Sequence, residues 1–231
     1  LRLSERATRL GSPLVLIRIA LTDHTDMGLF GRVGKGDPFD WLVVGLGNPG
    51  PKYVGTRHNV GEDAIKVLAE RTRSTLKGGR DNALLAETRL RGPDGDERIV
   101  LAFPITYMNQ SGQAVGALVR RFRIATAEQI IVVHDELDLS PGELKIKVGG
   151  GLAGHNGLRS MKQHLHTQDF IRVRIGVGKP PSGAGKNYVL SKVPKREREL
   201  LDVTIADAAD AVEMIVSDGV DAAMQRYNVK R

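Results

Sequence analysis

The chain of 231 residues contains no cysteine. This absence excludes disulfide bonds, thiolate metal sites and a cysteine nucleophile, and it is consistent with a reducing, cytoplasmic location. Aromatic residues are also scarce, at 4% of the chain. Glycine, by contrast, is abundant at 27 residues, which favours tight turns and close backbone approaches of the kind found around phosphate groups.

Long hydrophobic runs are absent as well. The longest apolar run near the N-terminus, residues 13–21, is interrupted by Arg18 and is far too short to span a bilayer. No small-residue cleavage pattern marks it as a signal peptide, so no membrane association is expected. Residues 1–40 lack sustained periodicity, and we interpret them as an N-terminal extension of unknown role that precedes a single domain at residues 41–231.

The net charge of +7 is distributed unevenly along the chain. Residues 41–198 carry 25 basic and 15 acidic side chains, a net charge of +10, whereas residues 199–231 carry 3 basic and 7 acidic side chains, a net charge of −4. A basic body of this kind indicates a polyanionic partner such as nucleic acid. The simpler alternative is a solvated, lysine-rich surface.

Hydrophobic periodicity predicts an alternation of strands and helices. Short apolar runs and alternating segments predict strands at residues 41–46, 83–89, 98–103, 129–134, 143–148 and 170–177. Helical spacing predicts helices at residues 60–73, 111–122, 157–166, 202–216 and 220–227. Strands interleaved with helices predict an α/β fold, a single domain whose mixed sheet is covered by helices on both faces.

Three glycine-containing segments look like nucleotide-binding motifs but lack essential parts of them. Residues 45–50 and 149–154 both match the GxGxxG pattern and both follow a predicted strand. Pro49 and Pro51, within and directly after the first segment, have no amide donor. No strand ending in an acidic residue follows the second segment at the required distance, so both features disfavour dinucleotide binding. Residues 185–186 lack the first glycine and the Ser/Thr of a P-loop, so no nucleoside triphosphate site is predicted.

Polar residues gather at the ends of the predicted strands, where ligands bind in open α/β sheets. Asn48 follows the first strand, His58 lies in the next loop, Asn109 follows the third strand, Asp135 ends the fourth, and Asn156 precedes a helix. A histidine with a carboxylate partner and several amides suits a base-activated water that attacks a carbonyl, with amide N–H groups receiving the oxyanion. The sequence does not determine whether His58 and Asp135 meet.

Each of these residues also has a simpler interpretation. Asn109 and Asn156 are candidate N-caps because both precede helices. Asp135 is a candidate for a cap or a salt bridge, and His58 for an ordinary hydrogen-bonded loop histidine.

Other catalytic chemistries have weaker support in the sequence. His134, Glu136 and Asp138 share a strand face and suggest a metal, but neither cysteine nor a His-x-x-x-His pair accompanies them, so no metal site is predicted. A serine nucleophile is not indicated because no GxSxG motif is present.

Six blocks of residues occur in a defined order between residues 41 and 231, namely 45–61, 104–112, 134–139, 149–158, 170–176 and 188–190. They include Gly-Leu-Gly-Asn-Pro-Gly, Thr-Arg-His-Asn-Val-Gly and His-Asp-Glu-Leu-Asp-Leu. Together the blocks resemble the signature of bacterial-type peptidyl-tRNA hydrolases. The resemblance implies a monomeric α/β enzyme that cleaves the ester between peptide and tRNA, recycles the tRNA, and needs no metal or cofactor.

The same resemblance assigns roles to the polar residues. It implies His58 as the general base that activates water, Asp135 as the carboxylate that orients it, and Asn48 as a hydrogen-bonding partner of the substrate's peptide backbone. It implies that Asn109 and Asn156 bind the end of the substrate and position the water or the oxyanion. It further implies two aromatic residues that line the site, Tyr53 and Tyr107.

Basic residues on two predicted strands are implied to contact the acceptor arm of the tRNA. Lys145, Lys147 and Arg174 match positions where the family binds phosphates. Alternation places Lys145 with Lys147, and Arg172 with Arg174, on shared strand faces. The alternative for each is a solvated strand face.

Three departures from the usual family pattern accompany the match. The extension at residues 1–40 has no usual counterpart, Leu152 and Ala153 replace other small or polar residues in the glycine loop, and residues 179–185 resemble a flexible gate over a peptide channel. Two other functions remain as hypotheses, an RNA-binding module that has lost catalysis and a dinucleotide oxidoreductase. The complete polar set argues against the first of these.

Overall fold

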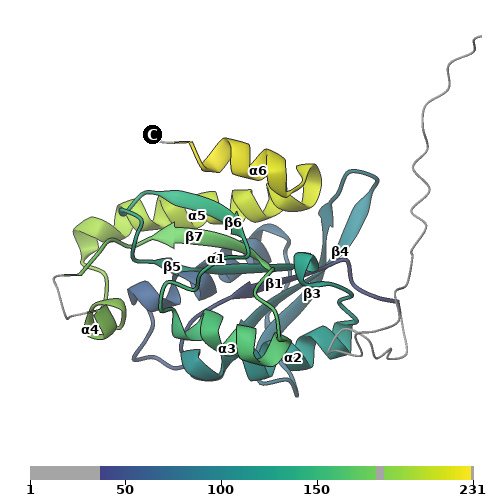
Figure 1. The fold of residues 1–231 in the computed structure, drawn as a ribbon, viewed down its shortest axis with the longest axis horizontal. Coiled ribbons are helices and arrows are strands. Elements are labelled where there is room, and N and C mark those ends of the chain that lie inside the picture. Colours follow the sequence, from purple (N-terminus) through teal and green to yellow (C-terminus); the bar gives the residue numbers. More distant parts are fainter. Residues whose placement is uncertain (1–36, 181–184, 230–231) are drawn as a thin grey trace, which may run out of the picture.

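Seven strands form one sheet in the computed structural model, which describes residues 37–180 and 185–229 (Figure 1). The strand order is β2-β3-β4-β1-β5-β7-β6. Strands β4, β1, β5 and β7 are parallel to one another, whereas β2 is antiparallel to β3, β3 to β4, and β6 to β7. The strands are β1 Trp41–Gly45, β2 Lys77–Gly78, β3 Ala83–Arg91, β4 Asp96–Pro104, β5 Ile130–Glu136, β6 Leu144–Val148 and β7 Ile171–Gly176. The predicted mixed sheet is confirmed.

Helices cover both faces of this sheet, as predicted; in Figure 1, α5 and α6 lie above it and α2 and α3 below it. Helices α1, α5 and α6 enclose one hydrophobic core, and α2 and α3 enclose another. Alternate residues of β5 serve the two cores, since Ile131 and Val133 belong to the first and Ile130 and Val132 to the second. The helices are α1 Val60–Arg71, α2 Ser111–Phe122, α3 Asn156–Leu165, α4 Gly185–Val189, α5 Lys195–Asp218 and α6 Val220–Tyr227.

Some element boundaries differ from those predicted by hydrophobic periodicity. Helix α5 begins at Lys195 rather than at residue 202, because its first residues are charged and exposed and the buried stripe starts only at Leu201. Strand β2 and helix α4 were not predicted, because each is too short to generate a periodic signal. No helix within the described ranges combines the length and the hydropathy needed to cross a membrane.

The N-terminal extension predicted at residues 1–40 lies mostly outside the described residues, which begin at residue 37. Within it, Phe39 is buried and packs edge-on against Phe122 with ring centroids 5.0 Å apart. Its backbone N–H also donates to the carbonyl of Phe122. Within the described residues, the segment just before β1 therefore already contacts the core.

A close approach between β1 and α1 determines where the loop before α1 lies. A Cβ atom on Gly61, near the start of α1, would overlap the carbonyl oxygen of Val133 and would lie 2.5 Å from the backbone nitrogen of Leu46. A Cβ atom on Gly45 would overlap the carbonyl oxygen of Gly61. The glycines allow α1 to begin directly against the carboxyl ends of β1 and β5, which brings residues 56–59 beside β5.

We expect Gly61→Ala to destabilise the protein by about 2–3 kcal/mol, because the backbone atoms that the new methyl group meets cannot rotate away. Urea unfolding measures this change in free energy. Gly78→Ala is the matched control, because a Cβ atom there would meet nothing nearer than Leu84 at 3.9 Å. The control should change stability by less than about 0.5 kcal/mol. Equal effects of the two substitutions would contradict the close-packing argument.

Candidate active site

A cavity of about 720 Å³ opens at the carboxyl end of the parallel strands. All seven residues predicted to be catalytic or substrate-binding line it. The full lining consists of Asn48, Tyr53, His58, Tyr107, Met108, Asn109, His134, Asp135, Glu136, Leu137, Ala153, Gly154, His155, Asn156, Arg159, Val189 and Leu190. Its walls come from loops that follow β1, β4 and β5, from the start of α3, and from the end of α4.

His58 and Asp135 meet at the base of this cavity, although they lie 77 residues apart in the chain. His58 belongs to a short 3-10 turn, Arg57–Asn59, that leads into α1. Its Nδ1 lies 2.8 Å from Oδ1 of Asp135, and both residues are buried. Because a carboxylate can only accept, Nδ1 carries the proton. The other ring nitrogen, Nε2, is therefore the one that can take a proton from a ligand.

A second histidine, His155, contacts the same carboxylate oxygen. Its Nε2 lies 3.0 Å from Oδ1 of Asp135, and its Nδ1 accepts the backbone N–H groups of Gly157 and Leu158. His155 is thus the N-cap of α3, and the N-cap interpretation of Asn156 is wrong. Since Nδ1 accepts hydrogen bonds, Nε2 carries the proton and donates to Asp135. Sequence reasoning missed His155, whose only signal was its position directly before a helix at the end of the glycine loop.

The two imidazoles control the charge of Asp135. Burial by itself raises the pKa of this carboxyl, but His58 and His155 together lower the pKa well below its usual range. Asp135 is therefore an anion near neutral pH and accepts hydrogen bonds from both imidazoles.

The same three side chains are the only group within residues 37–180 and 185–229 whose geometry is compatible with a shared metal ion. Their ligand atoms lie within 4.8 Å of one another. Two imidazole nitrogens and one carboxylate oxygen are a donor set that Zn²⁺ accepts. The hydrogen bonds among them already engage all three atoms, so a metal would have to displace those protons. His134, Glu136 and Asp138 do not form such a group.

Asn48 is held by the backbone of Met108 and by the side chain of Asn59. The side-chain oxygen of Asn48 accepts the backbone N–H of Met108 at 2.9 Å. Asn59 accepts the backbone N–H of Asn48 and donates to its carbonyl, while the same amide group also donates to Glu62. These bonds leave the Nδ2 group of Asn48 without a hydrogen-bond acceptor among the described residues, so it is available to a ligand. Asn59 had not been singled out from the sequence.

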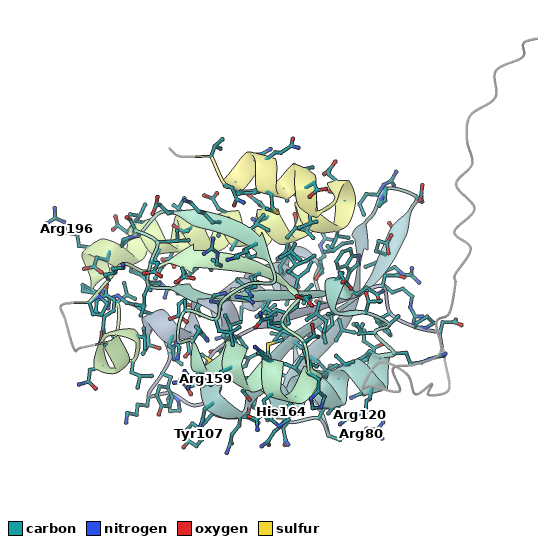
Figure 2. All side chains as sticks on the ribbon, viewed as in Figure 1. Arg80, Tyr107, Arg120, Arg159, His164 and Arg196 are labelled. Atoms are coloured by element: carbon teal, nitrogen blue, oxygen red, sulfur yellow. The ribbon has the colours of Figure 1, made fainter. Side chains whose placement is uncertain are left out.

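Two further amides stand at the rim of the cavity. Asn109 is exposed within a 3-10 turn, and Gln110 occupies the N-cap position of α2, so the N-cap interpretation of Asn109 is wrong as well. The side-chain oxygen of Asn156 accepts a hydrogen bond from Arg159 at 3.3 Å. Tyr107 is 58% exposed, and Figure 2 shows it on the same side of the molecule as Arg159. Both rim asparagines are thus free of helix-capping contacts.

The basic residues of β6 and β7 lie outside the cavity, on a neighbouring part of the sheet. Alternation was predicted to place Lys145 with Lys147, and Arg172 with Arg174, on shared faces. Lys145 is in register with Arg174, and Lys147 with Arg172, so the two pairs lie on one common face. Arg174 lies 3.5 Å from a carboxylate oxygen of Glu136 at the cavity wall.

Arg172 differs from its three neighbours in its burial. It is 2% exposed, and its guanidinium donates to the carbonyls of Gly150, Gly151 and Gln168. It therefore holds the glycine loop in place and does not face solvent, whereas Lys145, Lys147 and Arg174 are half-buried.

His134 lies beneath His155 and is fully enclosed. Its Nδ1 donates to the carbonyl of Asp135 at 2.7 Å, and its ring meets that of His155 edge-on, with centroids 4.9 Å apart. Within the described part of the chain its Nε2 has no hydrogen-bond partner. Burial, followed by the electrostatic effect of the neighbouring His155 imidazole, lowers the pKa of His134 to about 3. His134 is therefore a neutral packing and hydrogen-bonding element of the site.

Comparisons with known proteins agree with this arrangement. A family model described as "Peptidyl-tRNA hydrolase" matches residues 42–231. The peptidyl-tRNA hydrolase of Cutibacterium acnes is 50% identical over 196 residues, which cover 81% of this chain and 98% of the relative, and that of Frankia casuarinae is 48% identical over 189 residues, covering 81% and 93%. The crystal structure of peptidyl-tRNA hydrolase from Acinetobacter baumannii superposes with a TM-score of 0.75 at 38% identity, covering 85% of this chain and 99% of that one.

The enclosure of His134 predicts a specific loss of stability in acid. Between pH values of about 6.5 and 3 the unfolded chain binds a proton at this imidazole that the native state does not, so stability falls as pH falls, by roughly 1 kcal/mol per pH unit. His134→Asn keeps an N–H donor near the carbonyl of Asp135 and should remove this contribution. Urea unfolding of both proteins between pH 5 and about pH 8 tests it. The difference in stability between them should depend on pH below about 6.5 and be constant above it; a constant difference throughout would contradict the prediction.

Proposed function

The chain belongs to the peptidyl-tRNA hydrolase family, whose reaction is hydrolysis of the ester between a peptide and tRNA, and we propose that His58 activates the attacking water for this reaction. The observation that carries the proposal is the 2.8 Å contact between His58 Nδ1 and the buried carboxylate of Asp135. This contact leaves Nε2 as the basic nitrogen on the cavity side. Asp135 orients the ring and stabilises its charged form.

In the proposed reaction a water oxygen attacks the carbonyl carbon of the ester while His58 Nε2 takes one water proton. The tetrahedral intermediate then collapses, and the bond between the carbonyl carbon and the ribose oxygen breaks. The imidazolium gives its proton to the departing ribose oxygen, which becomes the free hydroxyl. The products are the free peptide acid and tRNA with an intact 3′ end, and His58 is restored to its starting form.

Asparagine amides supply the hydrogen bonds of the proposed site. Asn109 and Asn156 stand at the rim of the cavity and donate to the developing oxyanion or hold the water. The free Nδ2 group of Asn48 donates to a carbonyl of the peptide, which distinguishes a peptidyl end from an unblocked aminoacyl end. Tyr53 and Tyr107 line the cavity around this end of the substrate.

The tRNA part of the substrate is proposed to extend from the cavity over β6 and β7. Lys145, Lys147 and Arg174 then bind phosphates of the acceptor arm while the 3′ end enters the cavity. Arg172 is not part of this surface because it is buried beneath the glycine loop. We expect a monomer because the family resemblance implies one, and the proposed chemistry requires no metal or cofactor. Since peptidyl-tRNA arises during translation, the cytoplasm is the proposed location.

Replacement of His58 by alanine should lower kcat by about 10³-fold, because no other side chain replaces the general base. Affinity for tRNA should remain within about twofold of the wild-type value, since phosphate contacts dominate binding. The assay measures release of tRNA from N-blocked aminoacyl-tRNA, and wild-type protein should spare the unblocked form. His166→Asn, at the exposed end of α3, is the control and should retain full activity. Turnover that survives in His58→Ala would refute the mechanism.

The phosphate-binding role of β6 predicts a change in salt dependence. The slope of log K for tRNA binding against log salt is negative. In the double variant Lys145→Gln/Lys147→Gln its magnitude should decrease by about 2, one for each lost phosphate contact. Fluorescence binding assays with uncharged tRNA at several salt concentrations measure this slope. Lys77→Gln is the matched control, because Lys77 lies in β2 at the opposite edge of the sheet. If both proteins lose the same slope, the assignment to β6 fails.

A further inference from the structure

Arg57 is a buried charged residue that the proposed mechanism does not use. It is 5% exposed and directly precedes His58 in the 3-10 turn. Its guanidinium points away from the His58–Asp135 pair and into the segment that contains α4. Nη1 donates to the hydroxyl of Ser191 in that segment at 3.1 Å, and Nη2 donates to a carboxylate oxygen of Glu197, in the first turn of α5, at 2.5 Å. The charge is thus paired with a residue 140 positions later in the chain.

An aromatic ring completes the surroundings of this guanidinium. The central carbon of Arg57 lies 4.1 Å from the ring centroid of Tyr188, at the end of α4. The hydroxyl of Tyr188 in turn donates to the carbonyl of Val177, just beyond β7. A planar guanidinium can stack on a ring and donate to two acceptors at once, whereas a lysine ammonium cannot reproduce this combination.

The backbone of the same segment also pairs with the active-site loop. The N–H of Val193 donates to the carbonyl of Gly55 at 3.0 Å, and an isolated β-bridge joins Thr56 to Lys192. Side-chain and backbone contacts therefore converge on the few residues before His58. The α4 segment, residues 185–193, is therefore attached to the loop before His58 by both side-chain and backbone contacts.

Two apolar residues of the α4 segment form part of the cavity wall. Val189 and Leu190 follow Tyr188 directly and both line the cavity. They face a site whose other walls are mostly polar, so they provide apolar contact for a bound peptide. The position of this wall depends on the contacts that Tyr188 and Ser191 make with Arg57.

We propose that Arg57 is a positioning residue that fixes the α4 segment as a wall of the active-site cavity and thereby sets the affinity for the peptide end of the substrate. The inference rests on the proposed function, because it takes the cavity to be the peptide-binding site. Arg57 acts on binding rather than on chemistry, because His58 is held independently by Asp135 and by the close packing of Gly61 at the start of α1.

Steady-state hydrolysis of N-blocked aminoacyl-tRNA tests the proposal with Arg57→Lys. The substitution keeps the positive charge but loses the stacking and one hydrogen bond, so KM should rise about tenfold while kcat stays within about twofold. Arg71→Lys is the matched control. Arg71 also joins a helix to α5 through carboxylates, Asp210 at 2.6 Å and Glu213 at 3.4 Å, but it does not line the cavity. The control should change neither KM nor kcat.

A second pair of measurements covers the outcome that Arg57→Lys does not fold. Glu197→Gln removes the negative charge that faces Arg57, and Ser191→Ala removes a hydrogen-bond acceptor of Arg57. Neither residue is hydrogen-bonded to His58, so each substitution should raise KM severalfold without lowering kcat. Amide hydrogen exchange provides a readout independent of activity. The amide of Val193 should exchange faster in Arg57→Lys and Glu197→Gln than in the wild type. In Arg71→Lys its exchange rate should equal the wild-type rate.

These results separate the inference from the proposed function. A wild-type protein without hydrolase activity would overturn the proposed function, while hydrogen exchange would still report whether Arg57 holds the α4 segment. A fall in kcat at unchanged KM would overturn the inference, because Arg57 would then act through His58. Unchanged KM in the folded variants, or unchanged exchange at Val193, would overturn it too.

Discussion

One carboxylate oxygen, Oδ1 of Asp135, holds the active site together by accepting hydrogen bonds from two imidazoles. Isolated burial of that charge would be costly, and the donors that compensate it come from the turn before α1 and from the start of α3. Each donor reaches it because of a local feature. The glycine contact between β1 and α1 brings His58 to the end of β5, and capping of α3 fixes the ring of His155. The turn before α1 and the start of α3 must therefore both lie beside the end of β5 for this carboxylate to keep its two hydrogen bonds.

The sheet places the basic residues of β6 and the acidic residues of α5 and α6 on opposite faces. The cavity lies at the carboxyl ends of the parallel strands, whereas Lys145 and Lys147 project from the edge strand β6 on the face that α2 and α3 cover elsewhere. The acidic residues 199–231 belong mainly to α5 and α6 on the opposite face. Part of the uneven charge along the sequence thus becomes a difference between two faces. In the proposed binding mode, a polyanion would contact the basic edge beside the cavity rather than the acidic residues of α5 and α6.

Periodicity predicted most of the helices and strands. The bounds of α2 and α6 agree with the prediction to the residue. In α2, buried residues recur from Ser111 to Phe122. The start of α5 was missed because its first turns pack no apolar side chain. The N-cap assignment failed for a different reason: asparagine is the common capping residue, but the ring nitrogen of His155 can accept the same N–H groups. His155 was therefore not selected in advance. Asn59 and Arg159 were not selected either.

By itself the sequence determined the residue types, their periodicities and the ordered motifs, and these were sufficient for the α/β class, the family and seven of the residues that line the cavity. Only the tertiary structure decided the surroundings of residues that look alike in the sequence. Arg172 and Arg174 lie on the same strand face, yet Arg172 is buried under the glycine loop and Arg174 is half-buried beside Glu136. Arg57 and His58 are adjacent in the chain but face different neighbours. The physical reason is that burial, pKa and hydrogen-bond partners depend on segments distant in sequence, and a local pattern contains no information about which of those segments will arrive.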